Sequence, residues 1–182
     1  TWDHQIELTD YPCRADIVWE IPPLVVLVLS TATGNISVTD VETRVKAEVE
    51  VGNVEFSQLK GELQAKVSIG TIVGTSLAGS LLASVNKGNV EIYHMAGDLT
   101  VDCQMGDTTI DNHFGNVTAT VGLGDFQASM TGLSPSDTLA ITMGVGNASI
   151  LLPVLSSTAF EFTSPKAALV IQGFSTVQYT TN

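Results

Sequence analysis

Positive charge is scarce in this sequence. Seven Lys and Arg stand against nineteen Asp and Glu, which gives a formal net charge of −12, and only 14% of the residues are charged. A chain with so few cations cannot neutralise a run of phosphates, so DNA and RNA are poor partners for it. Long apolar runs are also missing, because the longest, residues 24–29, is far too short to cross a bilayer. We therefore expect no nucleic-acid partner and no membrane span.

Residues that commonly carry chemistry are few. The two cysteines, Cys13 and Cys103, lack the spacing of a metal or redox site, and the sequence leaves open whether they pair. The histidines, His4, His94 and His113, form neither a Ser-His-Asp set nor a zinc site, and we expect them on outward or corner positions. The sequence therefore predicts a protein that is not an enzyme and that has no cofactor.

Apolar residues, in contrast, are abundant. They make up 44% of the 182 residues, which is enough for one folded domain with a sizeable core. The chain begins at Thr1 rather than Met, so either an N-terminal segment is removed or the chain is trimmed. Maturation by cleavage would place the protein outside the cell. We therefore expect an extracellular or cell-surface location.

Glycine recurs with a period of eighteen residues. The residue after it is mostly Asn or Asp, a pairing that marks a turn. The series resumes at Gly146-Asn147 after a four-residue slip in residues 133–136. A second glycine nine residues further on marks a second corner, so each coil has two corners and two arms. The first series is Gly34, Gly52, Gly70, Gly88, Gly106 and Gly124, and the second is Gly61, Gly79, Gly97 and Gly115.

The two arms differ in their apolar pattern. The first arm changes phase, as in Val54, Phe56 and Leu59, which predicts that the arm bends or bulges before the next corner. The second arm alternates strictly, as a half-buried strand does. This alternation places the following residues inward: Leu63, Ala65, Val67, Ile69, Leu99, Val101, Cys103, Met105, Val117, Ala119, Val121, Leu123, Leu139, Ile141, Met143 and Val145.

Stacking such coils places equivalent residues about 4.8 Å apart, so each column becomes a ladder of touching side chains. Large side chains in the first arm then face small ones in the second, and Glu48 stacks on Lys66. The facing columns are Val38, Phe56, Gly74, Ile92, Ile110, Ala128 and Ile150 against Ala47, Ala65, Ala83, Val101, Ala119 and Ile141. The corner column suited to side-chain ladders is Asn35, Asn53, Thr71 and Asn89.

The sequence therefore predicts an all-β, single-domain β-solenoid (β-helix) with two-arm coils of eighteen residues, right-handed as parallel connections generally are. Residues 1–15 form an N-terminal extension or cap beside the open end. Residues 16–154 form the solenoid repeats, with 16–33 as a degenerate first coil. Residues 155–182 supply irregular C-terminal strands that complete the solenoid, with strands expected over 160–163, 168–171 and 177–179.

Two kinds of candidate site lie on the corners. Asp107 and Asp125 occupy adjacent coils of one corner column, where like carboxylates repel unless a cation or a shared proton intervenes, so they are a candidate calcium site. Asn35, Asn116 and Asn147 begin N-glycosylation sequons, although the repeat generates such triplets in any case.

The repeated units, such as Gly34-Asn35-Ile36-Ser37-Val38, and the closing segment from Gly146 to Pro153 resemble the adhesin-like β-solenoid domain family of bacterial and archaeal envelope and secreted proteins. The resemblance covers roughly residues 27–174. It implies a surface location and a non-enzymatic role, and it carries no binding residue over to this chain.

Two functions follow as hypotheses. The first is an extracellular structural protein whose solenoid ends associate into a homo-oligomer or filament, because a solenoid presents an unpaired strand at each end. The alternative is a monomeric cell-surface adhesion domain that binds a surface glycan through one sheet face. A polysaccharide hydrolase is disfavoured, since such enzymes need paired carboxylates in a groove and short coils leave little room for long loops.

Overall fold

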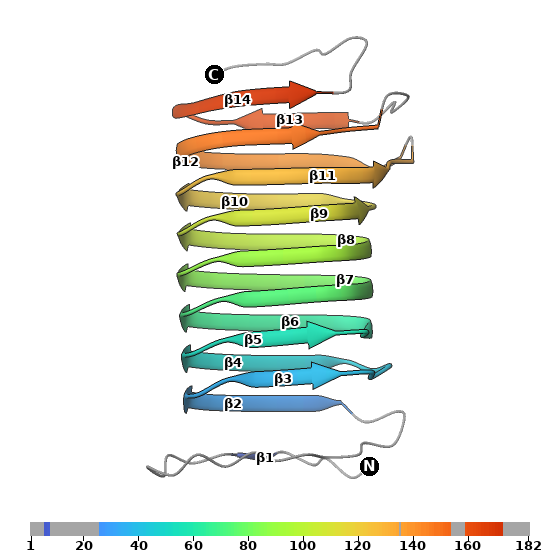
Figure 1. The fold of residues 1–182 in the computed structure, drawn as a ribbon, viewed down its shortest axis with the longest axis vertical. Helices are drawn as coiled ribbons and strands as arrows, with labels where there is room; N and C mark the ends of the chain where they lie inside the picture. Colours follow the sequence, from blue (N-terminus) through green and yellow to red (C-terminus); the bar gives the residue numbers. More distant parts are fainter. Residues whose placement is uncertain (1–5, 8–25, 135, 154–158, 173–182) are drawn as a thin grey trace.

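The computed structural model describes residues 6–7, 26–134, 136–153 and 159–172. These residues form an all-β solenoid of about eight turns, with parallel strands stacked along one axis (Figure 1). None of them belongs to a helix that could cross a membrane. The strands are β1 (Ile6–Glu7), β2 (Leu27–Thr33), β3 (Ile36–Thr39), β4 (Val45–Val51), β5 (Val54–Ser57), β6 (Lys60–Ile69), β7 (Ile72–Lys87), β8 (Val90–Met105), β9 (Thr108–Phe114), β10 (Val117–Leu123), β11 (Phe126–Gly132), β12 (Thr138–Leu151), β13 (Ala159–Thr163) and β14 (Lys166–Gln172).

The register follows the glycine period. Ala65 pairs with Ala83, and Val101 pairs with Ala119, so facing residues lie one coil of eighteen apart. Between β10 and β12 the register changes, because Val117 pairs with Leu139. The four extra residues lie between β11 and β12, where the sequence predicted the slip. The insertion therefore leaves the stack as a local loop, and the ladder continues above it.

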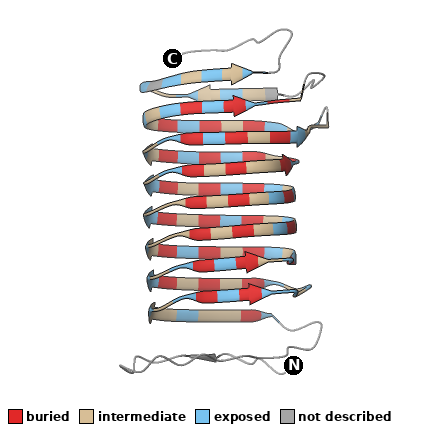
Figure 2. Cartoon of the chain, viewed as in Figure 1, coloured by how far each residue is buried: buried red, intermediate tan, exposed pale blue. Residues whose placement is uncertain are grey.

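The core lies between the two arms, and from β3 to β12 buried residues alternate with more exposed ones along the strands (Figure 2). Phe56 and Ile92 are fully buried in the first arm, and Ala47 and Ala83 are equally buried in the second. At Gly74 a Cβ atom would lie within 3 Å of Leu77 and Ile92 side-chain atoms, so neighbouring side chains fill that space. Both predicted core columns are therefore buried, and the matching of large with small residues across the arms stays a prediction.

The first arm bends, as the sequence predicted. Thr75 pairs with Tyr93 and Leu77 with Met95, while the residue between them in each strand has no ladder partner. That residue adopts a left-handed conformation, which turns the next apolar residue back into the core. The left-handed residues recur every coil and are Asp40, Gln58, Ser76, His94 and Asn112, with φ of 55–56°.

One inward prediction is wrong at the end of each second arm. The residues predicted to point inward there directly precede a corner glycine, where the space between the two arms ends. They are Ile69, Met105, Leu123 and Val145. They are 46–51% exposed, as is Val51 in the equivalent position. Together with Lys87 they form one column, which we call the corner ridge: Val51, Ile69, Lys87, Met105, Leu123 and Val145.

Strands at both ends continue the stack. β1 pairs in parallel with β2, Ile6 facing Leu29, so part of the predicted N-terminal extension lies beside the first coil. At the other end β13 and β14 both pair with β12, which confirms the strands predicted over 160–163 and 168–171. The beginning of the predicted first coil, residues 16–25, and the strand predicted over 177–179 lie outside the described residues.

Candidate functional site

Asparagine side chains connect the corners of successive coils. Asn35 Oδ1 accepts a hydrogen bond from the backbone N–H of Asn53 at 2.9 Å, and Asn53 Oδ1 accepts one from Thr71 at 2.9 Å. Further along, Asn89 Oδ1 accepts from the N–H of Asp107 at 3.1 Å. Each side chain thus satisfies a backbone donor of the next corner, as the predicted ladder requires.

Asp107 and Asp125 belong to the same ladder. Asp107 Oδ1 accepts from the Asp125 N–H at 2.9 Å, and Asp125 Oδ1 accepts from the Asn147 N–H at 2.8 Å. One oxygen of each carboxylate therefore does what an asparagine Oδ1 does elsewhere. Within the described part of the chain, no group of three or more His, Cys, Asp and Glu side chains could hold a metal ion. A calcium site at these two carboxylates stays a prediction.

Replacing Asp107 by asparagine tests whether a cation resolves the repulsion. The amide keeps the ladder oxygen but removes one of two like charges, so in EDTA we expect a gain of about 0.2–1 kcal/mol in the free energy of unfolding. Urea titrations of both proteins, with and without calcium chloride, measure it. If calcium raises the free energy of unfolding of the wild type but not of Asp107→Asn, the two carboxylates form a cation site. If Asp107→Asn is less stable than the wild type in EDTA, the two carboxylates do not repel each other.

The three sequons lie on corners as expected. Asn35 and Asn147 are exposed, and Asn116 is half-buried. The amide nitrogen of Asn116 donates to Asp98 at 2.8 Å, and that of Asn147 donates to Asp125 at 3.0 Å. Glycosylation at these two positions would place the glycan on an amide nitrogen that already donates to a neighbouring coil, whereas the ladder bond of Asn35 uses its oxygen. Asn35 is therefore the sequon that best suits a glycan.

A polar cluster on the outer face of the first arm was not predicted. The Tyr93 hydroxyl donates to Glu91 at 3.2 Å, and the Asn112 amide donates to Asp111 at 3.0 Å and lies 3.5 Å from His94 Nε2. Partial burial, followed by the nearby Glu91 carboxylate, raises the pKa of Tyr93. The sequence feature that could have revealed this cluster is the eighteen-residue offset, which places Tyr93 beside Asp111 and His94 beside Asn112. These groups present an aromatic ring beside hydrogen-bonding side chains.

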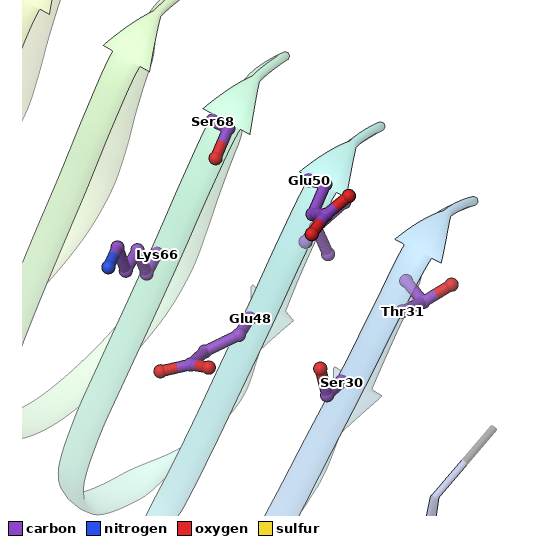
Figure 3. A pocket seen from close by; sticks show the side chains of 7 residues that line it. Ser30, Thr31, Glu48, Glu50, Lys66 and Ser68 are labelled. Carbon is purple, nitrogen blue, oxygen red and sulfur yellow. The ribbon is translucent and has the colours of Figure 1, made fainter. Parts of the chain in front are cut away.

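A shallow hollow lies on the outer face of the second arm (Figure 3). Its volume of about 190 Å³ is smaller than that of typical small-molecule sites. Glu48 faces Lys66 in the ladder as predicted, and its carboxylate forms an ion pair with Lys46 at 3.0 Å. Hydroxyl, carboxylate and ammonium groups here can bind a polar ligand, but no aromatic side chain lines the hollow. The lining residues are Ser30, Thr31, Glu48, Val49, Glu50, Lys66 and Ser68.

His113 is buried rather than outward as the sequence predicted. It occupies the inward position of the first arm that Met95 fills in the preceding coil, and it pairs with Met130 in the following one. Its Nε2 lies 3.2 Å from the carbonyl oxygen of Asn116, whereas the buried Nδ1 has no hydrogen-bond partner. Burial lowers the pKa of His113 below its usual 6.5, so the ring is neutral near pH 7.

The buried His113 predicts a stability that falls with acidity. Because the folded state resists protonation, the unfolded state takes up the proton first as the pH drops below about 6.5. The free energy of unfolding should then decline toward pH 5, at up to about 1.4 kcal/mol per unit. Urea titrations from pH 7.5 to 5 measure this slope. His113→Met introduces the residue that both ladder neighbours, Met95 and Met130, already have. In this variant the dependence of the free energy of unfolding on pH should become weaker. An unchanged dependence would contradict the role assigned to His113.

Cys103 fills the core, as its inward position predicted. It is a fully buried free thiol whose sulfur lies 3.4 Å from the carbonyl oxygens of Gly88 and Gly106. Burial raises the pKa of the thiol, and the neighbouring Thr108 hydroxyl acts in the opposite direction. Cys103 is therefore unpaired in this structure, and Cys13 lies outside the described residues.

Both ends of the described stack present a strand edge. β3 pairs only with β5, and β14 pairs only with β12, among the residues that the structure describes. Their inward residues continue the core columns, since Ile36 and Val38 are buried at one end and Leu169 and Ile171 pack against the core at the other. These edges and the two outer polar surfaces are the features of the solenoid that can meet a partner.

Comparisons with family models, with curated proteins and with solved structures find no match to this chain.

Proposed function

We propose that this protein is an extracellular structural protein whose solenoid subunits associate end to end into a filament or surface assembly. The observation that carries the proposal is the pair of edges at β3 and β14, each with a ladder partner on one side within the described stack. An edge strand is a template for another strand, and natural proteins protect free edges with charge, proline or a cap. Neither edge carries a dense cluster of charges. β3 has the sequence Ile-Ser-Val-Thr, and the one charged residue of β14 is Lys166.

The directions of the backbone groups support this proposal. The N–H groups of Ile36 and Asp40 donate to the carbonyl oxygens of Asn53, directly before β5, and of Ser57, its last residue. Because alternate residues of a strand direct their backbone groups to opposite sides, the N–H of Ser37 points away from β5, toward the free side. Among the described residues, no strand pairs with this side of β3, so a second subunit can add a strand there. A heterologous contact of this kind does not close on itself, so repeated addition gives a filament.

Ser37→Pro tests the proposal directly. Proline removes the outward N–H donor and leaves the bonds from β3 to β5 in place. We expect wild-type protein to form elongated assemblies whose size grows with concentration, and Ser37→Pro to remain monomeric with a closely similar melting temperature. Light scattering and negative-stain microscopy measure this. Ser37→Ala keeps the N–H and should assemble like the wild type.

Two results would overturn the proposal. One is a wild-type protein that stays monomeric at high concentration, and the other is a folded Ser37→Pro variant that assembles as well as Ser37→Ala. The melting temperatures show whether each variant is folded.

The second candidate function is a monomeric adhesion domain that binds a surface glycan. The Tyr93 cluster favours it, because a partly exposed aromatic ring beside Glu91 and Asp111 suits the apolar face and hydroxyl groups of a sugar. The resemblance to the adhesin-like family supports the same function. A glycan array with wild type and Tyr93→Ala tests it: hits that the variant loses support this function, and an array without hits contradicts it.

A further inference from the structure

The corner ridge is an exposed apolar surface that runs along one corner of the solenoid. Its five apolar members are each about half exposed, and they lie on successive rungs of one column, interrupted only by Lys87. Together they form a patch of roughly 400 Å², a size at which exposed apolar patches on soluble proteins are often interaction sites. The ridge is bounded by polar residues, because Thr33 pairs with Val51 and Lys166 pairs with Val145.

The four outer members of the ridge match their own reverse in chemical type, and its two central members, Lys87 and Met105, exchange places. Read from one end, its six members are Val, Ile, Lys, Met, Leu and Val. An antiparallel copy, related by a twofold axis between the rungs of Lys87 and Met105, would place Val51 opposite Val145 and Ile69 opposite Leu123. A surface that is complementary to itself in this way suits an isologous contact, in which the same patch serves on both subunits.

The one charge in the ridge also finds a partner in this arrangement. Lys87 of one copy would face Met105 of the other, on the rung whose corner carries the exposed Asp107. Asp107 uses one carboxylate oxygen in the corner ladder. Within the described part of the chain, the recorded ion pairs of lysine involve Lys46 and Lys60 and not Lys87. The twofold axis therefore produces two equivalent pairs between Lys87 and Asp107, and it brings together no two like charges of the ridge.

We propose that the corner ridge pairs two copies of this chain side by side in antiparallel orientation. Two ridges together would bury roughly 800 Å² of apolar area, less than the roughly 1,200 Å² of a stable interface, so an isolated pair is weak. The contact repeats along the solenoid axis. If subunits also associate end to end, successive ridges act together and the lateral contact strengthens. The pairing does not itself require end-to-end association.

Cysteine cross-linking tests the orientation. The background for the test is Cys13→Ser with Ser37→Pro. Cys13→Ser leaves the buried Cys103 as the one native thiol, and Ser37→Pro removes the proposed end-to-end contact. In this background we combine Ile69→Cys with Leu123→Cys. Within one molecule these positions lie three rungs apart, about 14 Å, which is too far for a disulfide. Mild oxidation should therefore convert the double variant to a covalent dimer. Each single variant should yield at least tenfold less dimer, because its cysteine faces an apolar residue.

Charge provides the matched control. Lys87→Glu would place a carboxylate beside Asp107 of the partner, and we expect it to lower the dimer yield of the double variant several-fold at low salt. The proposal is overturned if the double variant yields no dimer, or if Ile69→Cys alone yields as much, since the latter indicates a parallel or random contact. Because the background lacks end-to-end contacts, these outcomes are independent of whether filaments form.

Discussion

Replacing Gly70 by alanine is expected to unfold or severely destabilise the solenoid. Gly70 has φ of +142°, a region that is nearly exclusive to glycine, and an added Cβ would lie 1.8 Å from the carbonyl oxygen of Gly52. Neither backbone can move aside, because the N–H groups of Gly52 and Gly70 donate to Ile69 and Lys87. We expect the free energy of unfolding to fall by more than about 4 kcal/mol, as measured by urea titration.

Gly34→Ala is the matched control for this change. Gly34 has φ of +141°, but the nearest atom to an added Cβ is the Thr31 hydroxyl at 3.7 Å, because no described corner lies beneath it. It therefore carries the conformational strain without the collision, for a cost of about 1–3 kcal/mol. The difference between the two variants measures how closely the corners stack. Equal losses would contradict the stacking.

Phe56→Ala should produce the second large effect. The ring is fully buried and faces Val38 on one side and Gly74 on the other. Truncation of a buried phenylalanine costs about 3–5 kcal/mol, depending on how far the surroundings collapse. Gly74 has no side chain with which to fill the space, so we expect a loss near the upper limit. Chemical denaturation measures the loss.

Phe114→Ala makes the same chemical change at the surface. Phe114 is 47% exposed at the end of β9, so its truncation should cost only about 1 kcal/mol. A loss at Phe56 no greater than that at Phe114 would show that the first-arm column is not the centre of the core.

The period of the sequence was sufficient to predict the fold. A corner glycine every eighteen residues has a physical cause, since each corner lies against the carbonyl of the one before it, as Gly70 does against Gly52. Strand alternation then determines which residues point inward, and the change of phase at Leu59 marks the bend, directly after the left-handed Gln58. The slip before Asp137 was also visible, because the register of Gly146 is displaced by four residues.

Where alternation meets a corner, the same reasoning failed. Ile69 and Met105 continue the inward pattern of their strands, but the core ends before them, and a pattern of period two contains no information about where the opposing arm begins. The prediction for His113 was wrong for another reason. It was based on the usual preference of histidine for the surface and not on the position of His113 in the repeat. Its column holds Leu59, Leu77 and Met95, all buried, and this would have predicted its burial.

The candidate sites were only partly predictable. The corner ladder could be anticipated, because identical amides on successive rungs form one chain of bonds through Asn35 and Asn53. The Tyr93 cluster was only partly visible in the sequence, since Glu91 lies two residues from Tyr93 in the same strand, whereas His94 and Asn112 meet only when adjacent rungs are superposed. Its contacts to Glu91 and between Asn112 and His94 depend on side-chain orientations that the repeat does not determine.

Fibre diffraction from concentrated wild-type protein, aligned by drying or flow, tests the central proposal most directly. If solenoids add end to end, the strands lie across the filament, and the spacing of about 4.8 Å between rungs should appear as a reflection along the fibre axis. Ser37→Pro should give no oriented fibres. Contradiction would come from a wild-type protein that forms no filaments at any concentration, or from filaments whose 4.8 Å reflection lies perpendicular to their axis.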